Sequence, residues 1–510
     1  MTADTATFWL LLVTGFTLAL TVWFSKRRSK LPLPPGPPHH WLFGTEVLTG
    51  SWVGFERPWL RYEEMTQKYG PIFSLRRGLT DIIIIIGRYE PALEIMEKEN
   101  AILQDRPRSI ALQETMCKNM RLLMMKAGER FKKFRRAIQS QLHARVIQTY
   151  QPLQVKNAVN LVMDLLDDPS QHIDHAKRYA ASVVITLTYG KPSTTSYSDP
   201  LVQKILLFAH RFGTVVRPGA YWVDSVPILQ YVPGYLSQLR KWHEEELAFS
   251  RSSVDAVKEK ISHSEHIIKP NFVQNLLEKN SENSMSEDEI AFLSGGLFLA
   301  GADTTASAIS IMMIAAACFP AAQNKVQGQL DAVVGQGRAP TFTDEASLPF
   351  ITAFILECYR WRPVSATGFP HRAMKEIVWR GYRIPAGATV IGSHWSIGRS
   401  PDVFPEPEKF RLERWLDDSG NLRDDIKSMN FGFGRRVCPG QQLANRSLFI
   451  TTAFVLWAFR LKEVDGSPID TQAFTQTANL HPLPFALDIE ARIPKDEIKG
   501  MLASDLETLV

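Results

Sequence analysis

Cysteine is scarce in this chain, which has four among its 510 residues: Cys117, Cys318, Cys358 and Cys438. They form no CxxC pair and follow no regular spacing, so the sequence indicates neither a zinc site nor a disulfide framework. Such cysteine use fits a reducing compartment. Charge of one sign is limited as well, because the formal net charge is +5. That surplus suits an anionic partner or a membrane surface and does not imply nucleic-acid binding.

The sequence has no repeats or low-complexity blocks after its first forty residues, and no flavin- or nicotinamide-binding motif. The hydrophobic share of 45% and the charged share of 22% are ordinary for a globular protein. Length alone would allow several domains. The uninterrupted pattern instead predicts one large domain over residues 39–510, with a core sizeable enough to surround a buried cofactor.

The stretch from Phe8 to Phe24 is uncharged and mostly apolar, which predicts a single transmembrane helix at the short end of the usual range. Positive charges follow it at once, from Lys26 to Lys30. A cleavable signal peptide carries its positive charge before the apolar run, so this order predicts a retained membrane anchor over residues 1–30. The positive-inside rule then leaves the N-terminus lumenal and the rest cytosolic. The proline-rich segment 31–38 predicts a semi-rigid hinge, with a flexible linker as the alternative.

The most informative stretch is FGFGRRVCPG, from Phe431 to Gly440, which holds Cys438 in a glycine-rich turn. An apolar run follows it, from Leu443 to Phe459, and predicts a helix. Three features predict a lowered pKa for the thiol: the charges of Arg435 and Arg436, the helix N-terminus downstream, and loop amides free to point at sulfur. The glycines allow a tight backbone against a large flat ligand.

Two other interpretations of this loop compete. A lone cysteine is most often a buried, inert small hydrophobe, but paired arginines are costly beside an inert core thiol. A glycine-rich turn can also hold a dinucleotide, yet the third glycine of a GxGxxG pattern would fall on Val437. The string resembles instead the heme-binding loop of the cytochrome P450 family, which has five fixed positions. All five match: Phe431, Gly434, Arg436, Cys438 and Gly440.

This resemblance implies a cytochrome P450 fold, mainly α-helical with a smaller β region. It makes Cys438 the axial thiolate ligand of heme b iron, which pushes electron density toward iron and favours O–O cleavage. It also implies that Arg436 pairs with a heme propionate. The resemblance covers residues 32–492, nearly the whole chain, so the domain over residues 39–510 is expected to be the catalytic domain.

A second motif lies in the predicted helix Ser286 to Phe319, which is almost wholly apolar after an acidic first turn. Such a helix is expected to be buried on all sides. Its segment from Ala300 to Thr305 reads AGADTT. Polar side chains there are costly unless they have partners or a function, and a hydrogen-bonded helix kink is the alternative. The segment is similar to the family's oxygen-activation motif, which implies that Thr304 donates a hydrogen bond and that Asp303 delivers protons from solvent.

The predicted helix Gly128 to Leu142 places Phe131 and Arg135 on one face, because they are four residues apart. The family has tryptophan and arginine here, both in contact with heme propionates, so the resemblance implies such a contact for Arg135. Phe131 keeps the aromatic packing and lacks the indole N–H. The same helix carries three further basic residues: Lys132, Lys133 and Arg136. They predict a docking surface for an acidic flavoprotein reductase, with a solvated helix face as the alternative.

Glu357 and Arg360 lie three residues apart in the predicted helix Leu348 to Trp361, and such pairs contribute little on a surface. The pair matches the family's Glu-x-x-Arg motif, however. The resemblance therefore implies a Glu357–Arg360–Arg414 network that fixes the heme loop. It also implies that Arg372 is a further propionate partner.

Three strands are predicted, at Ile82 to Ile86, Glu376 to Arg383 and Thr389 to Ser393. Two segments of weak periodicity resemble the family's substrate-recognition regions: Ser109 to Met125 and Phe474 to His481. The first is rich in methionine, which adapts to varied shapes and equally fills ordinary cores. Leu201 to Ser250 is predicted to be helical with an aromatic, proline-broken middle, and it resembles the mobile roof of the family's substrate pocket, although membrane-facing packing would use the same residue types.

The resemblance as a whole implies a single-pass enzyme of the endoplasmic reticulum membrane with its catalytic domain in the cytosol. This enzyme would insert one atom of O2 into a C–H or C=C bond of an apolar small molecule and reduce the other atom to water. Electrons would come from NADPH through a separate cytochrome P450 reductase, with cytochrome b5 as a further candidate partner. No nucleic acid is expected as a partner.

The style of stretches such as residues 368–392 looks most like basidiomycete fungal members, which often act on terpenoids or other secondary metabolites. A fatty acid or an aromatic xenobiotic would suit an apolar pocket equally well. Two further alternatives are a heme-thiolate isomerase or dehydratase, and a non-catalytic membrane heme protein. The intact pair of Asp303 and Thr304 argues against both.

Overall fold

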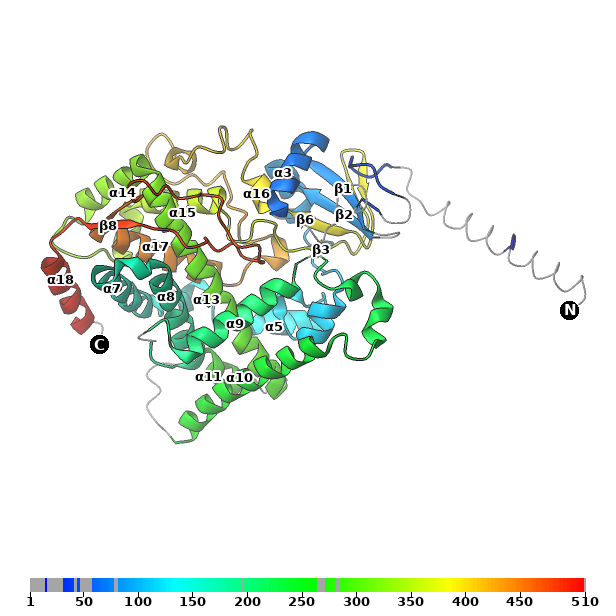
Figure 1. Cartoon of the computed structure of the whole chain (residues 1–510), viewed down its shortest axis with the longest axis horizontal. Coiled ribbons are helices and arrows are strands. Elements are labelled where there is room, and N and C mark those ends of the chain that lie inside the picture. The colour runs from blue at the N-terminus through cyan, green and yellow to red at the C-terminus, as the bar shows by residue number, and fades with distance from the viewer. Residues whose placement is uncertain are drawn as a thin grey trace, which may run out of the picture.

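The computed structural model describes residues 14–15, 31–40, 44–45, 57–77, 81–193, 196–217, 219–263, 271–280 and 284–508. The predicted transmembrane helix at residues 8–24 lies outside the described residues, apart from Thr14 and Gly15. The described part is mainly helical, as the sequence predicted. Its smaller β region includes a sheet of β1, β2, β6 and β3 on one side of the molecule, while β8, which pairs with β7, lies on the opposite side (Figure 1).

Most of the predicted elements are present, with bounds close to those expected. The helices are α3 (Pro58–Tyr69), α4 (Tyr89–Pro91), α5 (Glu129–Gln139), α6 (Ala144–Gln148), α7 (Gln151–Asp167), α8 (His172–Tyr189), α9 (Pro200–Val215), α10 (Ser237–Ser262), α11 (Phe272–Glu278), α13 (Glu287–Cys318), α14 (Pro320–Val333), α15 (Pro349–Trp361), α16 (His394–Ile397), α17 (Gln441–Ala458) and α18 (Lys495–Thr508). The strands are β1 (Ile72–Arg77), β2 (Asp81–Ile86), β3 (His371–Arg372), β4 (Ile377–Trp379), β5 (Tyr382–Ile384), β6 (Thr389–Gly392), β7 (Phe459–Lys462) and β8 (Asp488–Ala491).

Helix α13 runs through the middle of the molecule (Figure 1). A capping box fixes its start, because the Ser286 hydroxyl accepts from the Glu289 amide and the Glu289 carboxylate accepts from the Ser286 amide. Along the part of the chain that the structure describes, α13 is the one helix long and apolar enough to cross a membrane. However, 78% of its most apolar 18-residue stretch is buried inside the protein, so it serves as the central helix of the core.

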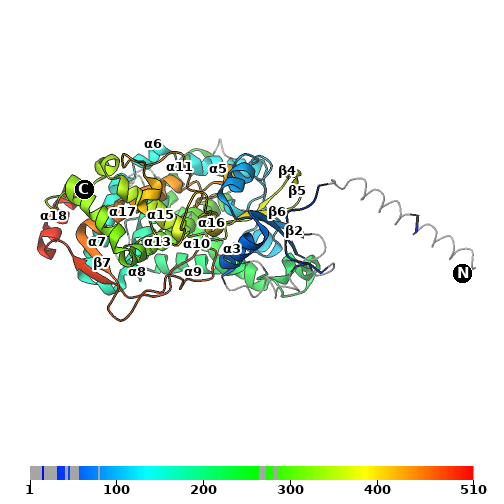
Figure 2. The same cartoon turned by 90° about the horizontal axis from the view of Figure 1, so that it is seen from above.

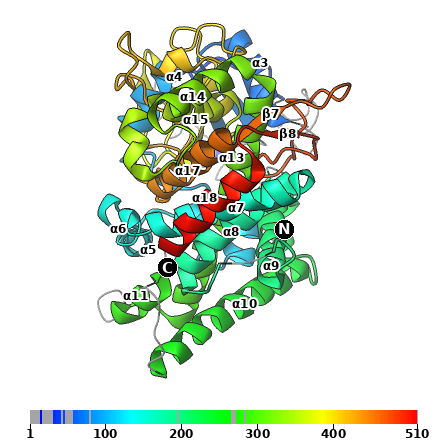
Figure 3. The same cartoon turned by 90° about the vertical axis from the view of Figure 1, so that its left-hand side faces the viewer.

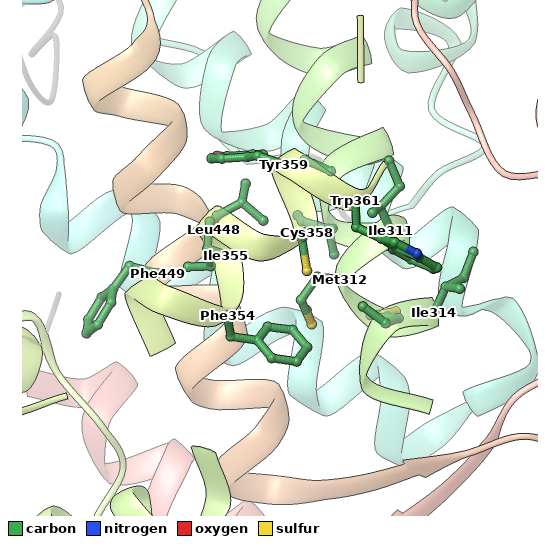
Figure 4. Packing of buried hydrophobic residues seen from close by; sticks show 14 of the residues in the cluster. Ile311, Met312, Ile314, Phe354, Ile355, Cys358, Tyr359, Trp361, Leu448 and Phe449 are labelled. Carbon is green, nitrogen blue, oxygen red and sulfur yellow. The ribbon is translucent and has the colours of Figure 1, made fainter. Parts of the chain in front are cut away.

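Helices α15 and α17 pack against α13 and build a dense apolar core. Figure 4 shows Phe354, Cys358 and Trp361 of α15 close to Met312 of α13 and Leu448 of α17. Each of these side chains is almost fully buried. Burying one such side chain contributes about 1.5–3 kcal/mol relative to leaving it in water. This core fixes α17, which directly follows the predicted thiol loop, relative to α13, which carries Asp303 and Thr304.

The four-stranded sheet has the order β1-β2-β6-β3, in which β2 and β6 are parallel and the other pairs are antiparallel. The single strand predicted at residues 376–383 is instead a hairpin of β4 and β5. The reason is the turn between them, where Arg380 and Gly381 have φ of 45° and 83°. Two consecutive left-handed residues are typical of a tight hairpin turn.

The segment predicted as one interrupted helical region, residues 201–250, consists of α9 and α10 with two short 3₁₀ turns between them. In Figure 3, α9, α10 and α11 lie on one side of the molecule, opposite α14 and α15. Figure 2 shows α18 at the end away from β2 and β6. Helices α9 and α10 pack along α13 and cover the space beside it.

Candidate active site

A cavity of about 620 Å³ lies beside the middle of α13. Its wall joins segments far apart in the sequence: α13, the loop of residues 431–440, the start of α17 and the C-terminal loop of residues 475–484. Eight of the predicted site residues line it: Phe131, Arg135, Asp303, Thr304, Phe431, Arg436, Cys438 and Gly440. The other five are not among the described residues of the wall: Gly434, Arg372, Glu357, Arg360 and Arg414.

The loop of residues 431–440 presents one thiol to this cavity. Cys438 is accessible although its loop is folded into the protein, because its side chain faces the cavity. The Cys438 amide donates to the Phe431 carbonyl oxygen at 2.8 Å and closes the loop. Gly434 has a φ of 49°, and a Cβ at this position would lie 2.2 Å from the Cβ of Asn100. The loop can therefore take this path only with glycine at position 434.

Burial raises the pKa of the Cys438 thiol, while hydrogen bonds from the Gly440 and Gln441 amides and the charge of Arg135 act to lower it. The prediction of a lowered pKa is therefore wrong for the protein groups alone, because desolvation outweighs them. Arg435, which the prediction relied on, is exposed. A bound metal ion changes this balance, since a coordinating thiol is deprotonated outright.

Three arginines form a cationic cluster along one part of the wall. Arg436 donates from Nε to the Gln104 carbonyl at 2.6 Å and from Nη2 to the Met125 carbonyl at 2.8 Å. Its Nη1 is buried and has no hydrogen-bond partner among the described residues. Burial and the nearby charge of Arg436 lower the pKa of Arg106 to about 9. Burial likewise lowers the pKa of Arg135, against the opposing effect of the Cys438 thiolate.

The ring of Phe131 packs against Arg436, one member of this cluster. The guanidinium carbon of Arg436 lies 3.6 Å from the centroid of the Phe131 ring, within the range of a cation–π interaction. The ring is itself almost fully buried, at 5% exposure. The aromatic side chain at position 131 therefore still has a function here, because it holds Arg436 in the cavity wall.

The side chains of His371 and Arg372 lie on opposite faces of strand β3, because successive side chains on a strand alternate between faces. His371 is buried, lines the cavity and has its Nδ1 at 2.7 Å from the Leu103 carbonyl oxygen. The Arg372 side chain is 48% exposed, and its guanidinium lies 3.6 Å from the Asp105 carboxylate. The structure therefore does not bring Arg372 to the cavity. It brings Arg106 there, a residue that no sequence motif marked.

The Glu357 carboxylate forms the centre of a fully buried network behind the loop. It accepts two hydrogen bonds of 2.8 Å from Arg360, one of 3.3 Å from Arg414 and one of 3.0 Å from the Trp415 indole. Arg360 donates further to the carbonyl oxygens of Gly398 and of Pro407. The network ties α15 to the segment of residues 398–415, so its role is structural.

On the α13 side of the cavity, the Thr304 hydroxyl donates to the Ala300 carbonyl at 2.8 Å. The neighbouring Asp303 carboxylate is held by the C-terminal loop. Its Oδ1 lies 3.0 Å from His481 Nε2, and its Oδ2 accepts a hydrogen bond of 2.7 Å from the side-chain amide of Asn479. Burial alone would raise the pKa of Asp303. The His481 charge and the hydrogen bonds from His481 and Asn479 outweigh burial, so the pKa lies below its usual value.

Arg121, which lines the cavity, forms a buried ion pair that no sequence motif indicates. Arg121 donates from Nη2 to the Glu246 carboxylate, and both side chains are at least nine-tenths buried. The guanidinium carbon also lies 4.7 Å from the Phe292 ring centroid and 5.5 Å from that of Phe212. The pair joins the segment before α5 to α9, α10 and α13. It therefore connects the parts that cover the cavity.

The residues present fit a heme group. Arg106 and Arg436 are buried and repel each other, with Arg135 close to Arg436, and a buried donor without an acceptor, such as Arg436 Nη1, costs about 1–3 kcal/mol. A flat ligand with two carboxylates on one edge would satisfy both. Cys438, which lines the same cavity, would supply the sulfur ligand for a metal in that group.

A thiol loop, a cationic edge and an acid–alcohol pair around one cavity define the site of a heme-thiolate protein. The chain belongs to the cytochrome P450 family, whose model, described as Cytochrome P450, matches residues 34–489. Three fungal relatives are similar over almost their whole length. Cytochrome P450 monooxygenase 64 of Postia placenta is 51% identical, with 97% of this chain and 98% of that protein covered. Cytochrome P450 monooxygenase 113 of the same fungus is 48% identical, with 94% and 95% covered. A cytochrome P450 monooxygenase of Armillaria gallica is 31% identical, with 95% of both covered.

The protein is therefore a cytochrome P450 monooxygenase. Membership of the family implies heme iron, O2, a small-molecule substrate and a redox partner. The prediction of a mainly α-helical P450 fold with a smaller β region is confirmed, and so is the likeness to basidiomycete members.

Proposed function

We propose that the chain is a microsomal-type monooxygenase that hydroxylates or epoxidises an apolar small molecule, with Cys438 as the axial ligand of heme iron. One observation carries this proposal. The thiol loop with Cys438 and the acid–alcohol pair of Asp303 and Thr304 on α13 line the same cavity, although Cys438 lies more than 130 residues after the pair in the chain. Thiolate-ligated heme supplies the oxygen-activating chemistry when bound.

The protein groups divide the remaining work. Arg106, Arg135 and Arg436 would hold the propionates, with Phe131 supporting Arg436. The cavity wall on the α9 and α13 side is largely apolar, and its members exclude water and orient the substrate: Met120, Phe212, Phe292, Leu293, Leu297 and Phe369. Thr304 would hold a proton at its hydroxyl, and Asp303 would pass protons toward it.

Electrons would come from NADPH through a separate cytochrome P450 reductase, with cytochrome b5 as a second donor. The basic residues of α5 support such a docking surface, since Lys132 and Arg136 are exposed. Their charge is partly balanced within the chain. Lys132 lies 2.7 Å from Glu129, and Lys133 lies 3.2 Å from Glu289.

The proposal places the protein on the endoplasmic reticulum membrane. It has an anchor in residues 1–30, a hinge in residues 31–38 and the catalytic domain in the cytosol. The segment between α9 and α10 supports a membrane location. Trp222, Ile228 and Tyr231 are 62%, 71% and 77% exposed there, which is unusual for large apolar side chains gathered in one segment.

The substrate class is proposed to be a terpenoid or another fungal secondary metabolite, and a fatty acid or an aromatic compound is the second candidate. The test is to reconstitute the purified protein with heme, a cytochrome P450 reductase and NADPH, after titration with each class while the heme Soret band is followed. A saturable shift toward high spin with one class, and oxygenated product from it, is expected. Product formed without NADPH would instead support an isomerase or dehydratase.

Replacing Thr304 with alanine is expected to lower product formed per NADPH by roughly 10²-fold, the scale of a general acid–base contribution. The hydroxyl that now donates to Ala300 would be gone, whereas the cavity and the thiol loop would remain. NADPH oxidation, hydrogen peroxide release and product are measured together. Ser294→Ala is the matched control, because the Ser294 hydroxyl donates the same kind of hydrogen bond, to the Ile290 carbonyl four residues before it, in an earlier part of α13. Unchanged product in Thr304→Ala would contradict the assigned role.

A further inference from the structure

The Asp303 carboxylate is not free in the cavity, because the C-terminal loop engages both of its oxygens. His481 Nε2 lies 3.0 Å from Oδ1, and the Asn479 amide donates to Oδ2 at 2.7 Å. The sequence indicated residues 474–481 only as a segment that resembles a substrate-recognition region, and nothing in it pointed to this contact with an acid more than 170 residues earlier. The two loop residues therefore decide the position and the charge of Asp303.

The loop is fixed where it meets α13. The Ser307 hydroxyl, one turn after Asp303, donates to the Leu480 carbonyl, and the Leu480 amide donates to the Val364 carbonyl at 2.7 Å. Within the loop, the Thr475 amide donates to the His481 carbonyl at 2.8 Å, and the His481 amide donates to the Thr475 hydroxyl at 3.0 Å. His481 is thus held beside the acid by the backbone on both sides.

The two loop contacts differ in what they can do. Asn479 is a neutral donor and cannot change its charge. Imidazole binds and releases a proton near neutral pH, and the His481 side chain is 24% exposed, so water can exchange protons with it. His481 is also the charge that lowers the pKa of Asp303. The other ionisable side chains of the described cavity wall include Arg121, Lys177, Tyr197 and His210.

We propose that His481 is the positioning residue that supplies protons to Asp303, so that protons enter the active site through the C-terminal loop. In this step the Nε2–H bond of the imidazolium breaks and an O–H bond forms on Oδ1 of Asp303. The neutral imidazole then takes a proton from bulk water. The proton on Asp303 moves on toward Thr304. The inference rests on the proposed function, because it needs Asp303 to act in proton delivery.

His481→Gln tests this, because glutamine keeps a neutral donor of similar size and cannot carry a proton. Product per NADPH is expected to fall by about 10-fold, and its dependence on pH is expected to weaken, because glutamine binds no proton. The second readout is independent of turnover. Infrared difference spectra of the holoenzyme should show the protonated-carboxyl band of Asp303 up to a higher pH in His481→Gln than in wild type, because the His481 charge that lowers the pKa of Asp303 is absent. Adding Asp303→Asn should remove the band.

His143→Gln is the matched control, since His143 is an exposed histidine before α6. A thiolate-type heme spectrum verifies that each variant is folded. If Asp303→Asn leaves product per NADPH unchanged, the proposed role of Asp303 fails, and the inference fails with it. If Asp303→Asn lowers it while His481→Gln leaves coupling, the pH profile and the infrared spectrum unchanged, the inference alone is overturned.

Discussion

Replacing Cys438 with serine is expected to abolish the thiolate signature in the optical spectrum of the carbon monoxide complex and to reduce product to background. All four cysteines are described by the structure, and Cys438 is the one that lines the cavity. Cys117 and Cys358 are buried elsewhere, and burial raises the pKa of the Cys117 thiol to about 11. No second thiol is therefore positioned to replace the first. A hydroxyl is a poor ligand here because it stays protonated and donates little electron density to iron.

Cys318→Ser is the matched control for this experiment. Cys318 ends α13, and its sulfur lies 3.8 Å from the Glu463 carboxylate, outside the described wall of the cavity. Its replacement is expected to leave both the spectrum and the product unchanged. A thiolate-type spectrum that survives in Cys438→Ser would mean that another residue binds the iron. The assignment of the whole loop would then be wrong.

Local sequence patterns predicted the helices well because short-range interactions, such as caps and periodic apolar residues, determine where those helices begin and end. The apolar run and acidic first turn of residues 286–319 gave α13 to within one residue, since the capping box and the continuous hydrophobicity leave little choice. The pattern of residues 376–383 predicts one strand where the structure has the hairpin of β4 and β5. The turn depends on two left-handed residues, Arg380 and Gly381, and their residue types alone indicate such a turn only weakly.

The site divides in the same way. Cys438 and Thr304 were predicted from fixed motifs with unusual spacing, and both line the cavity. The contacts of Arg106, Arg121 and His481 were not predicted, because each residue pairs with a segment more than 100 residues away. Tertiary contacts of this kind are set by how α9, α10, α13 and the C-terminal loop pack, and no short pattern encodes them. Arg372 shows the converse error, since the alternation along β3 turns it away from the cavity.

The second large effect is expected from Glu357→Gln, which removes one charge from a fully buried network without changing its volume. Glu357 is 0% exposed and Arg360 is 1% exposed, so the guanidinium would keep its charge with no carboxylate to pair with. Removing one partner of a buried ion pair costs about 3–5 kcal/mol. We expect the free energy of unfolding of the heme-loaded protein to fall by about this amount, measured by denaturant titration followed by circular dichroism.

The loss is expected to reach the heme as well, although the network touches no part of the cavity. Glu357 holds the segment of residues 398–415 through Arg414 and Trp415, and the chain continues from there through residues 416–430 into the thiol loop. Less heme should therefore be retained at a given denaturant concentration. Asp167→Ala is the control, because its pair with Lys499 is exposed and surface pairs contribute little. If Glu357→Gln proved as stable as Asp167→Ala and kept its heme equally well, the buried network would have no part in fixing the loop.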